Sequence, residues 1–174
     1  MKTHLKKIII IITLFFVNSN LTADVPYYVD FKYILNQSIA GKKAQSLLKN
    51  KLEQGLKKLS EQEKNILKEE KQLIQQKKLI KPDEYKNKVN SLRSKVLSLQ
   101  KERDGLLKSV SKQRLKARNE LLKNLNPIIS EYMQEKKIRM VVDKKSILLA
   151  DQNLDITKQI IELLNKKLKS VKLN

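Results

Sequence analysis

The fold is decided by residues 82–117, which read PDEYKNKVNSLRSKVLSLQKERDGLLKSVSKQRLKA. Apolar residues recur there at alternating steps of four and three, the heptad pattern that places one narrow stripe against a partner helix. The pattern predicts a long amphipathic helix whose seam is formed by Tyr85, Val89, Leu92, Val96, Leu99, Leu106 and Val110. Because Arg103 and Gln113 occupy further positions of the same stripe, the seam is expected to be loosely packed.

A second amphipathic helix is predicted immediately before this stretch. Its apolar residues recur every seven positions, with further apolar residues beside them: Leu52, Leu59, Ile66, Leu73 and Ile80, then Leu48, Leu56, Leu67 and Ile74. The companion seam positions are mostly polar, as at Glu63, Glu70 and Lys77. This limb would therefore pack poorly in a coiled coil with a copy of itself, and it needs the following limb as its partner.

Pro82 marks the point at which the two limbs meet. Proline lacks a backbone donor and crowds the preceding turn, so it ends the first helix, and it suits the opening turn of the second. Asp83 and Glu84 complement the positive end of that second helix. Residues 42–133 are thus predicted to form an antiparallel helical hairpin with its tip at 81–84, around Pro82 and Asp83. A continuous rod kinked at Pro82 is the alternative.

The composition limits the chemistry that the chain can perform. Of its 174 residues 40% are hydrophobic and 5% aromatic, and it contains no Cys and no Trp. Such a chain has room for one domain with long helices and cannot build thiolate metal sites. The single His is His4, and no glycine-rich phosphate-binding motif is present. We therefore expect no enzyme activity, no cofactor and no metal.

The chain is strongly basic, with a formal net charge of +20. Residues 1–23 hold three Lys and no acid, so +17 remains without them, and residues 42–125 carry +14 (24 Lys and Arg against 10 Asp and Glu). We expect a basic arm surface that includes Lys57, Lys64, Lys68 and Lys71. A surplus of this size attracts polyanions, although a solvated lysine-rich helix face explains it equally well. Without interleaved aromatic residues, no specific nucleic-acid function is expected.

Residues 1–23 have the features of a secretory signal. Three lysines precede an uncharged apolar run of ten residues, Ile8–Val17, and a polar segment then leads to an expected cut between Ala23 and Asp24. Ten residues are too few to span a bilayer as a helix, which takes about twenty. The mature protein is therefore expected to be exported and soluble outside the cytoplasm. An uncleaved anchor is the minor alternative.

The two ends of the chain, 24–41 and 134–174, are predicted to build a small β-body. Alternating residues in Val25–Tyr33 predict a strand, and Ile138–Asp143, a turn at Asp143–Ser146 and Ile147–Ala150 predict a β-hairpin. Asp155 is the expected N-cap of a last helix that runs to about Leu168. The fold class is therefore α+β and mostly α. So small a body is expected to complete itself by oligomerising. Its predicted core, shared between the associated chains, comprises Tyr27, Val29, Phe31, Met140, Val142, Leu148, Ile160 and Leu164.

Four segments carry a resemblance to a known family: Val29–Gln45, Met140–Asp143, Ile147–Asp151 and Leu154–Ile161. Together they resemble the Skp/OmpH-type periplasmic chaperones over about residues 25–168, with the limbs similar in pattern and length only. The resemblance implies a homotrimer with a shared β-body and three helical arms around a cavity. It also implies an ATP-independent holdase that shields unfolded outer-membrane proteins in the periplasm.

Some members of that family carry a basic lipopolysaccharide-binding site on the arms. The site is not matched residue by residue here, because Leu99 stands near the place where a basic residue would be sought. Anionic lipid or lipopolysaccharide is accordingly a further partner implied by the resemblance alone. Two other classes of function stay open: an exported structural coiled coil, which would form a parallel rod without a β-body, and a secreted enzyme.

Overall fold

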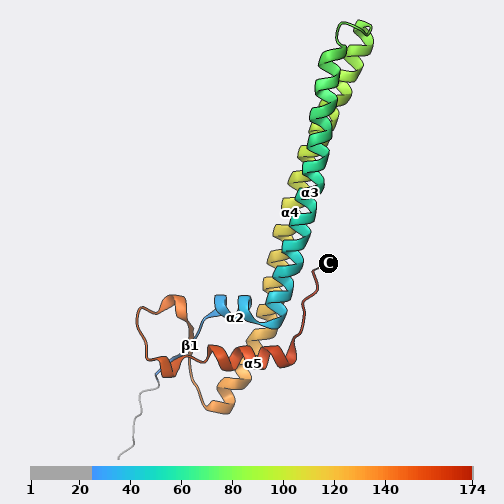
Figure 1. Ribbon diagram of the computed structural model, residues 1–174. Helices are drawn as coiled ribbons and strands as arrows, with labels where there is room; N and C mark the ends of the chain where they lie inside the picture. Colours follow the sequence, from blue (N-terminus) through green and yellow to red (C-terminus); the bar gives the residue numbers. More distant parts are fainter. Residues whose placement is uncertain (1–24, 174) are drawn as a thin grey trace, which may run out of the picture.

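The computed structural model describes residues 25–173. The expected signal segment and its cleavage site, Ala23 and Asp24, lie outside the described residues. A long pair of helices projects from a small body, and the C-terminal segment runs from that body along the base of the helix pair (Figure 1). The fold is mostly helical with one two-stranded sheet, which confirms the predicted class.

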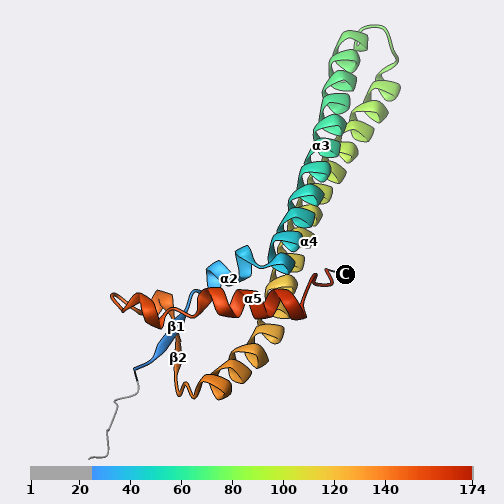
Figure 2. The same ribbon diagram turned by 60° about the horizontal axis from the view of Figure 1, so that its bottom comes forward.

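The projecting arm consists of α3 (Ile39–Gln76) and α4 (Pro82–Lys136). They lie side by side and antiparallel in both ribbon views, with the turn between them at the end farthest from the body (Figures 1 and 2). Pro82 is the first residue of α4, and Asp83 and Glu84 occupy its first turn, where carboxylates favour the positive helix end. The first helix ends at Gln76 and not at Pro82, so residues 77–81 form the connecting turn.

The sheet of the body joins the two ends of the chain. β1 (Tyr27–Val29) pairs in parallel with β2 (Val141–Asp143), with Tyr28 opposite Val142. Parallel strands need a long crossover connection, and here the whole arm supplies it. On its other edge β1 makes one further bridge, from Tyr28 to Asp155. The strand therefore lies between two segments that follow the arm in sequence.

The prediction of a β-hairpin after the arm is wrong. A 3-10 turn, η1 (Lys144–Ser146), follows β2 directly, and a second one, η2 (Gln152–Leu154), precedes the last helix. The Asp143 carboxylate accepts from the backbone N–H of Lys145 (3.3 Å), and Asp151 accepts from Asn153 (2.9 Å). These side-chain bonds turn the chain away from an extended path. The apolar run 147–150 consequently has no strand partner within the described chain.

The strand predicted over Val25–Tyr33 is shorter than expected. It ends at Val29, because the Asp30 carboxylate accepts from the backbone N–H of Tyr33 (2.8 Å) and so caps α2 (Phe31–Gln37). Phe31 and Tyr33 therefore lie on a helix. Ser38 then separates α2 from α3, and its hydroxyl accepts from Gly41 N–H (3.2 Å) while the side chain is fully buried.

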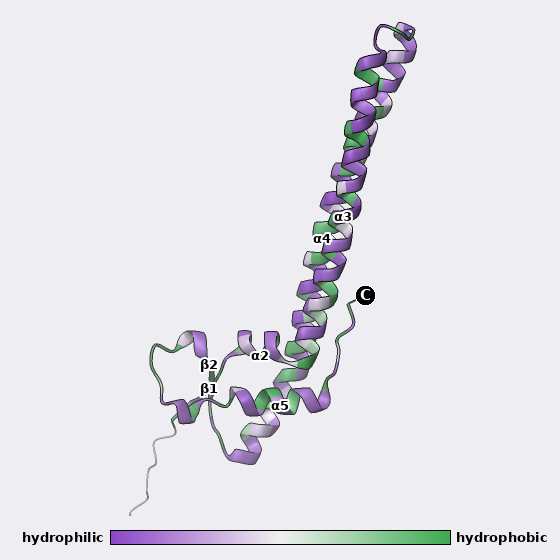
Figure 3. Ribbon diagram, viewed as in Figure 1, coloured by the Kyte–Doolittle hydropathy of each residue, from purple (hydrophilic) through white to green (hydrophobic). Residues whose placement is uncertain are grey.

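The core of the body is formed where α2, α5 (Thr157–Lys167) and the last turns of α4 meet. Figure 3 shows apolar residues gathered on α5 and the lower part of α4, whereas most of the arm is hydrophilic. The fully or nearly fully buried members of this core are Val29, Ile34, Leu125, Ile128, Ile156, Ile160 and Leu164. α4 runs through Pro127 without ending and stops at Lys136, past the arm boundary expected at 133.

The last helix is anchored at both ends. The N-cap position of α5 is Ile156 and not Asp155 as predicted, although the Asp155 carboxylate accepts from the backbone N–H of Thr157 (2.9 Å), the first residue of the helix. The Thr157 hydroxyl in turn accepts from Asp30 N–H (2.9 Å). Near the other end, Asn165 accepts from Ile39 N–H (2.7 Å), the first residue of α3. α5 thereby positions the root of the arm against the body.

Candidate functional site

The seam between α3 and α4 follows the predicted heptads. Leu59 and Leu73 on α3 and Val110 and Ala117 on α4 are buried. The other predicted seam residues of α4 are half-buried: Tyr85, Val89, Leu92, Leu99 and Leu106. Val96 differs, since it is 49% exposed. The apolar stripes face each other as expected, but much of the seam stays accessible to solvent.

On α3, one of the four residues predicted beside the seam, Leu48, is buried, and the other three are not. Leu56, Leu67 and Ile74 are exposed. Gly55 and Gln62 are half-buried instead, at the positions three residues from the buried or half-buried leucines. A narrow seam with a glycine and a glutamine in it leaves these apolar side chains in solvent along the arm.

Polar cross-links hold the two helices in one register. Glu69 and Lys95 are joined at 2.7 Å, Arg103 and Glu63 at 3.3 Å, and Lys51 donates to Gln113 at 2.9 Å. Exposed ion pairs of this kind contribute only about 0.2–1 kcal/mol each. Arg103 and Gln113 were expected to loosen the seam, whereas they bridge it, because the opposite limb offers each of them a partner.

Near the tip the two sides of the seam differ in chemistry. One side is a groove of about 540 Å³ lined mainly by apolar side chains: Ile66, Leu73, Ile74, Tyr85, Val89, Leu92, Val96 and Leu97, with Glu70 and Arg93. We call it the tip groove. The other side is a smaller hollow of about 300 Å³ lined mainly by polar side chains: Glu69, Gln72, Gln76, Lys88, Ser91 and Lys95. Leu73 and Leu92 line both, so they separate the two sides.

The four lysines predicted as a basic arm surface are exposed on α3. Their spacing of seven, four and three residues places Lys57, Lys64, Lys68 and Lys71 along one face of the helix. Within residues 25–173 none of them has a carboxylate oxygen within 4 Å. This face therefore presents unneutralised positive charge to solvent.

At the end of α4, the hydrogen bond from Lys136 to Glu135, with the charge of that carboxylate, raises the pKa of Lys136.

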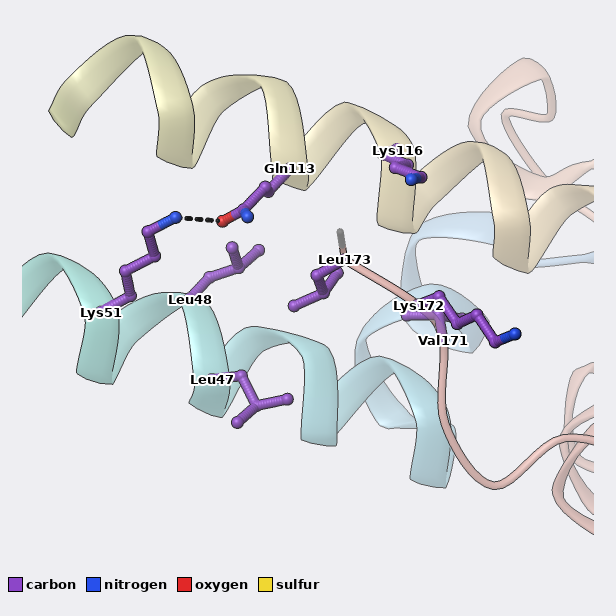
Figure 4. A pocket seen from close by; sticks show the side chains of 8 residues that line it. All are labelled: Leu47, Leu48, Lys51, Gln113, Lys116, Val171, Lys172 and Leu173. Carbon is purple, nitrogen blue, oxygen red and sulfur yellow. Dashed lines mark hydrogen bonds between the residues drawn. The ribbon is translucent and has the colours of Figure 1, made fainter. Parts of the chain in front are cut away.

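The C-terminal segment crosses the root of the arm. Val171 is buried against Ala44 and Leu121, on α3 and α4. Leu173 points into the space between the two helices, near Leu48, in a hollow of about 550 Å³ (Figure 4). This contact was not predicted from the sequence. The available signal was the alternation of Leu168, Val171 and Leu173 with lysines after the last helix.

The predicted body residues fall into three groups. Val29, Ile160 and Leu164 are fully buried, and Tyr27 and Phe31 pack against the core while partly exposed. Val142 is half-buried on β2. Met140 and Leu148 are not buried in the described chain, and Leu148, with its neighbour Leu149, is almost completely exposed (100% and 94%). The core residues that the sequence missed are Ile34, Leu125, Ile128 and Ile156.

Residues 25–173 contain neither a membrane-spanning helix nor a metal site. No helix there is long and apolar enough to cross a membrane. The same residues contain no group of His, Asp or Glu side chains placed to hold a metal ion.

Comparison with protein families gives one match, to the family described as outer membrane protein (OmpH-like), over residues 27–164. The chain belongs to the OmpH-like family. That span covers β1, the whole arm with its tip groove, and most of α5. No curated protein matches the chain.

Among solved structures, this OmpH-like chain is similar to a crystal structure from Caulobacter crescentus CB15 of an OmpH-like protein proposed to be an outer membrane chaperone. The TM-score is 0.78 at 21% sequence identity, over 90% of this chain and 94% of the other. At this identity the match establishes the shared fold: a long helical arm on a small body recurs in a solved structure.

Proposed function

We propose that the mature chain is an ATP-independent periplasmic holdase. It binds unfolded outer-membrane proteins between its helical arms and prevents their aggregation before membrane insertion. Membership of the OmpH-like family supports this proposal, as does the chaperone function suggested for the Caulobacter crescentus protein of the same fold.

The tip groove is the observation that carries the proposal. An unfolded β-barrel protein is apolar at alternate residues and exposes strands that aggregate until they pair. A chaperone that binds such a chain needs accessible apolar side chains on a scaffold that keeps its own fold. The arm meets this need because Leu73 and Leu92 close the seam while Ile74 and Leu97 beside them stay exposed.

The basic arm surface supports the capture step. Exposed charge raises the rate of encounter with an oppositely charged partner more than it raises final affinity. Lys57, Lys64, Lys68 and Lys71 present such charge, and none of them has a carboxylate oxygen within 4 Å among the described residues. Acidic unfolded clients are therefore drawn to the arm, and anionic lipid or lipopolysaccharide is a secondary partner of the same surface. Release needs no nucleotide, because the client leaves for a membrane in which its folding is downhill.

The working form is a homotrimer whose body is shared between chains. Exposed apolar residues in the body support this assembly, above all the adjacent Leu148 and Leu149, because apolar side chains that one chain leaves in water are covered when chains associate. Three arms would then surround one cavity. Export depends on residues 1–23 as a signal peptide, cleaved between Ala23 and Asp24, which places the mature protein in the periplasm.

The test is suppression of aggregation of an outer-membrane β-barrel protein diluted from urea. The mature chain is expected to hold light scattering near baseline at stoichiometric amounts and without ATP. An equal concentration of a helical coiled coil of similar length is the control. If scattering rises as it does with the control, the holdase proposal is wrong, and the alternative, an exported structural coiled coil in the envelope, takes its place.

A further inference from the structure

The two sides of the seam near the tip differ in a way that the holdase proposal does not require. We propose that the tip groove is a peptide-binding site for one class of segment: an apolar stretch of unfolded polypeptide flanked by Asp or Glu. This inference rests on the proposed function and deepens it, because it assigns the contact to one side of the arm and states the sequence chemistry that it selects.

The shape and lining of the groove suit an apolar segment. Its volume of about 540 Å³ lies within the range of small-ligand sites, roughly 300–1,000 Å³. Eight of the residues that line it are apolar or aromatic, and they come from both helices. Ile74 and Leu97 are 62% and 63% exposed at its edge, so a bound segment would remove from water apolar surface that the chain itself leaves uncovered.

The charge around the groove favours acidic flanks. Of the seven Lys and Arg from Lys77 to Leu97, Lys88 and Lys95 line the opposite hollow and are paired with Glu84 and Glu69, whereas the other five have no carboxylate oxygen within 4 Å among the described residues. Arg93 lines the groove itself. Lys78, Lys81 and Lys86 are exposed. A segment with carboxylates at its ends would therefore neutralise these cations while its centre fills the groove.

Glu70 favours a polypeptide over an anionic lipid as the occupant. It is the one carboxylate in the lining, and it lies among apolar residues of α3. A carboxylate repels a phosphate headgroup, but it accepts a hydrogen bond from a backbone N–H of a bound peptide. Tyr85 brings a hydroxyl that can donate or accept in the same way.

The test uses a short peptide with an apolar centre that contains one Trp and with Glu residues at both ends. Because the protein has no Trp, the peptide fluorescence reports binding without background. A second peptide carries Lys at its ends. The groove variant is I74Q with L97Q, and the matched control is L67Q with L115Q. Leu67 and Leu115 lie on the same helices, are 50% and 57% exposed and do not line the groove.

The wild type and the control variant should bind the Glu-flanked peptide at least about tenfold more tightly than the Lys-flanked one. The groove variant should lose about five- to tenfold in affinity for the Glu-flanked peptide. Equal affinities of the groove and control variants would overturn the proposal, as would a preference for the Lys-flanked peptide. Groove-dependent binding of phosphatidylglycerol vesicles without peptide binding would assign the groove to lipid and overturn it too.

The same proteins separate this inference from the holdase function. If the wild type suppresses aggregation of the β-barrel client and the groove variant binds peptide like the control, the inference alone fails. If the wild type binds the peptide through the groove but does not suppress aggregation, the holdase function fails and the groove stands.

Discussion

Gly55 of α3 lies directly against Leu106 of α4: a Cβ added to Gly55 would stand 2.5 Å from Leu106 Cδ2. The leucine side chain therefore occupies the space that any larger residue at position 55 would need. Gly105, the other glycine in the middle of the arm, has open space at the corresponding position, with no atom within 4 Å. Both glycines lie within helices, but Gly55 is half-buried against the partner helix whereas Gly105 is exposed.

This difference predicts opposite responses to alanine. Gly105→Ala should raise the free energy of unfolding by about 0.5–1 kcal/mol, because glycine costs a helix that much backbone entropy. Gly55→Ala should lack this gain, since Leu106 must move away from the seam to admit the methyl group. Urea unfolding followed by circular dichroism measures both values. Equal stabilisation by the two substitutions would show that the helices are not in close contact at Gly55.

The core of the body should respond to cavity formation. Ile160 is fully buried between α4 and α2, so Ile160→Ala should lower the free energy of unfolding by about 2–4 kcal/mol. Leu115→Ala is the control, because Leu115 is exposed on the arm and its loss should stay within about 0.5 kcal/mol. Thermal and urea melts of both variants test the assignment. A loss for Ile160→Ala no larger than the control would contradict it.

Self-association is predicted to depend on the exposed loop after β2. Replacing Leu148 and Leu149 together with Glu should convert the proposed trimer to smaller species, because it would place charge in the apolar contact proposed between chains. Helix content should not change, since both side chains are exposed within one chain. Sedimentation velocity measures the mass, with Leu107→Glu and Leu115→Glu on the arm as the matched control. A trimer unaffected by the loop substitutions would exclude this loop as the interface.

The turn at the end of the arm should open more readily than the body. Leu79 is 82% exposed, and residues 77–81 lie at the far end of the arm (Figure 1). Few buried contacts hold such a turn, so the amides of Leu79 and Ile80 should exchange with solvent much faster than that of Ile160. Hydrogen exchange read by mass spectrometry distinguishes the two regions. Protection at Ile80 equal to that at Ile160 would contradict the prediction.

The helical part of the fold could be predicted because its signals are local. The heptad stripe around Leu92 and the proline at position 82 specify helices and a turn from short stretches of sequence. The tip groove was less predictable. Ile74 and Leu97 lie beside the seam and not in it. Only the pairing of the two helices shows that these two residues line one side of the seam, whereas Gln72 and Lys95 line the other side.

The body was predicted less well, because short polar contacts override its apolar patterns. Asp30 ends β1 by capping α2, although the alternation of residues continues to Tyr33. Asp143 does the same after β2, so the apolar run that contains Leu148 leaves the sheet. The pairing of β1 with β2 is parallel and joins residues more than a hundred positions apart, a choice that no local pattern indicates.

The central claim is that the basic, apolar-edged arms capture unfolded client chains. The most direct measurement is stopped-flow capture of a labelled, urea-diluted outer-membrane protein at several salt concentrations, with the wild type and a Lys57→Glu, Lys64→Glu, Lys68→Glu, Lys71→Glu variant. Exposed charges are screened over about 8 Å at physiological ionic strength, whereas apolar contacts are not weakened by salt. For the wild type, the account predicts an association rate that falls as the salt concentration rises and a dissociation rate that changes less. For the variant, it predicts slower capture of an acidic client while the proposed trimer stays intact. Absence of capture by the wild type at every salt concentration would contradict the account.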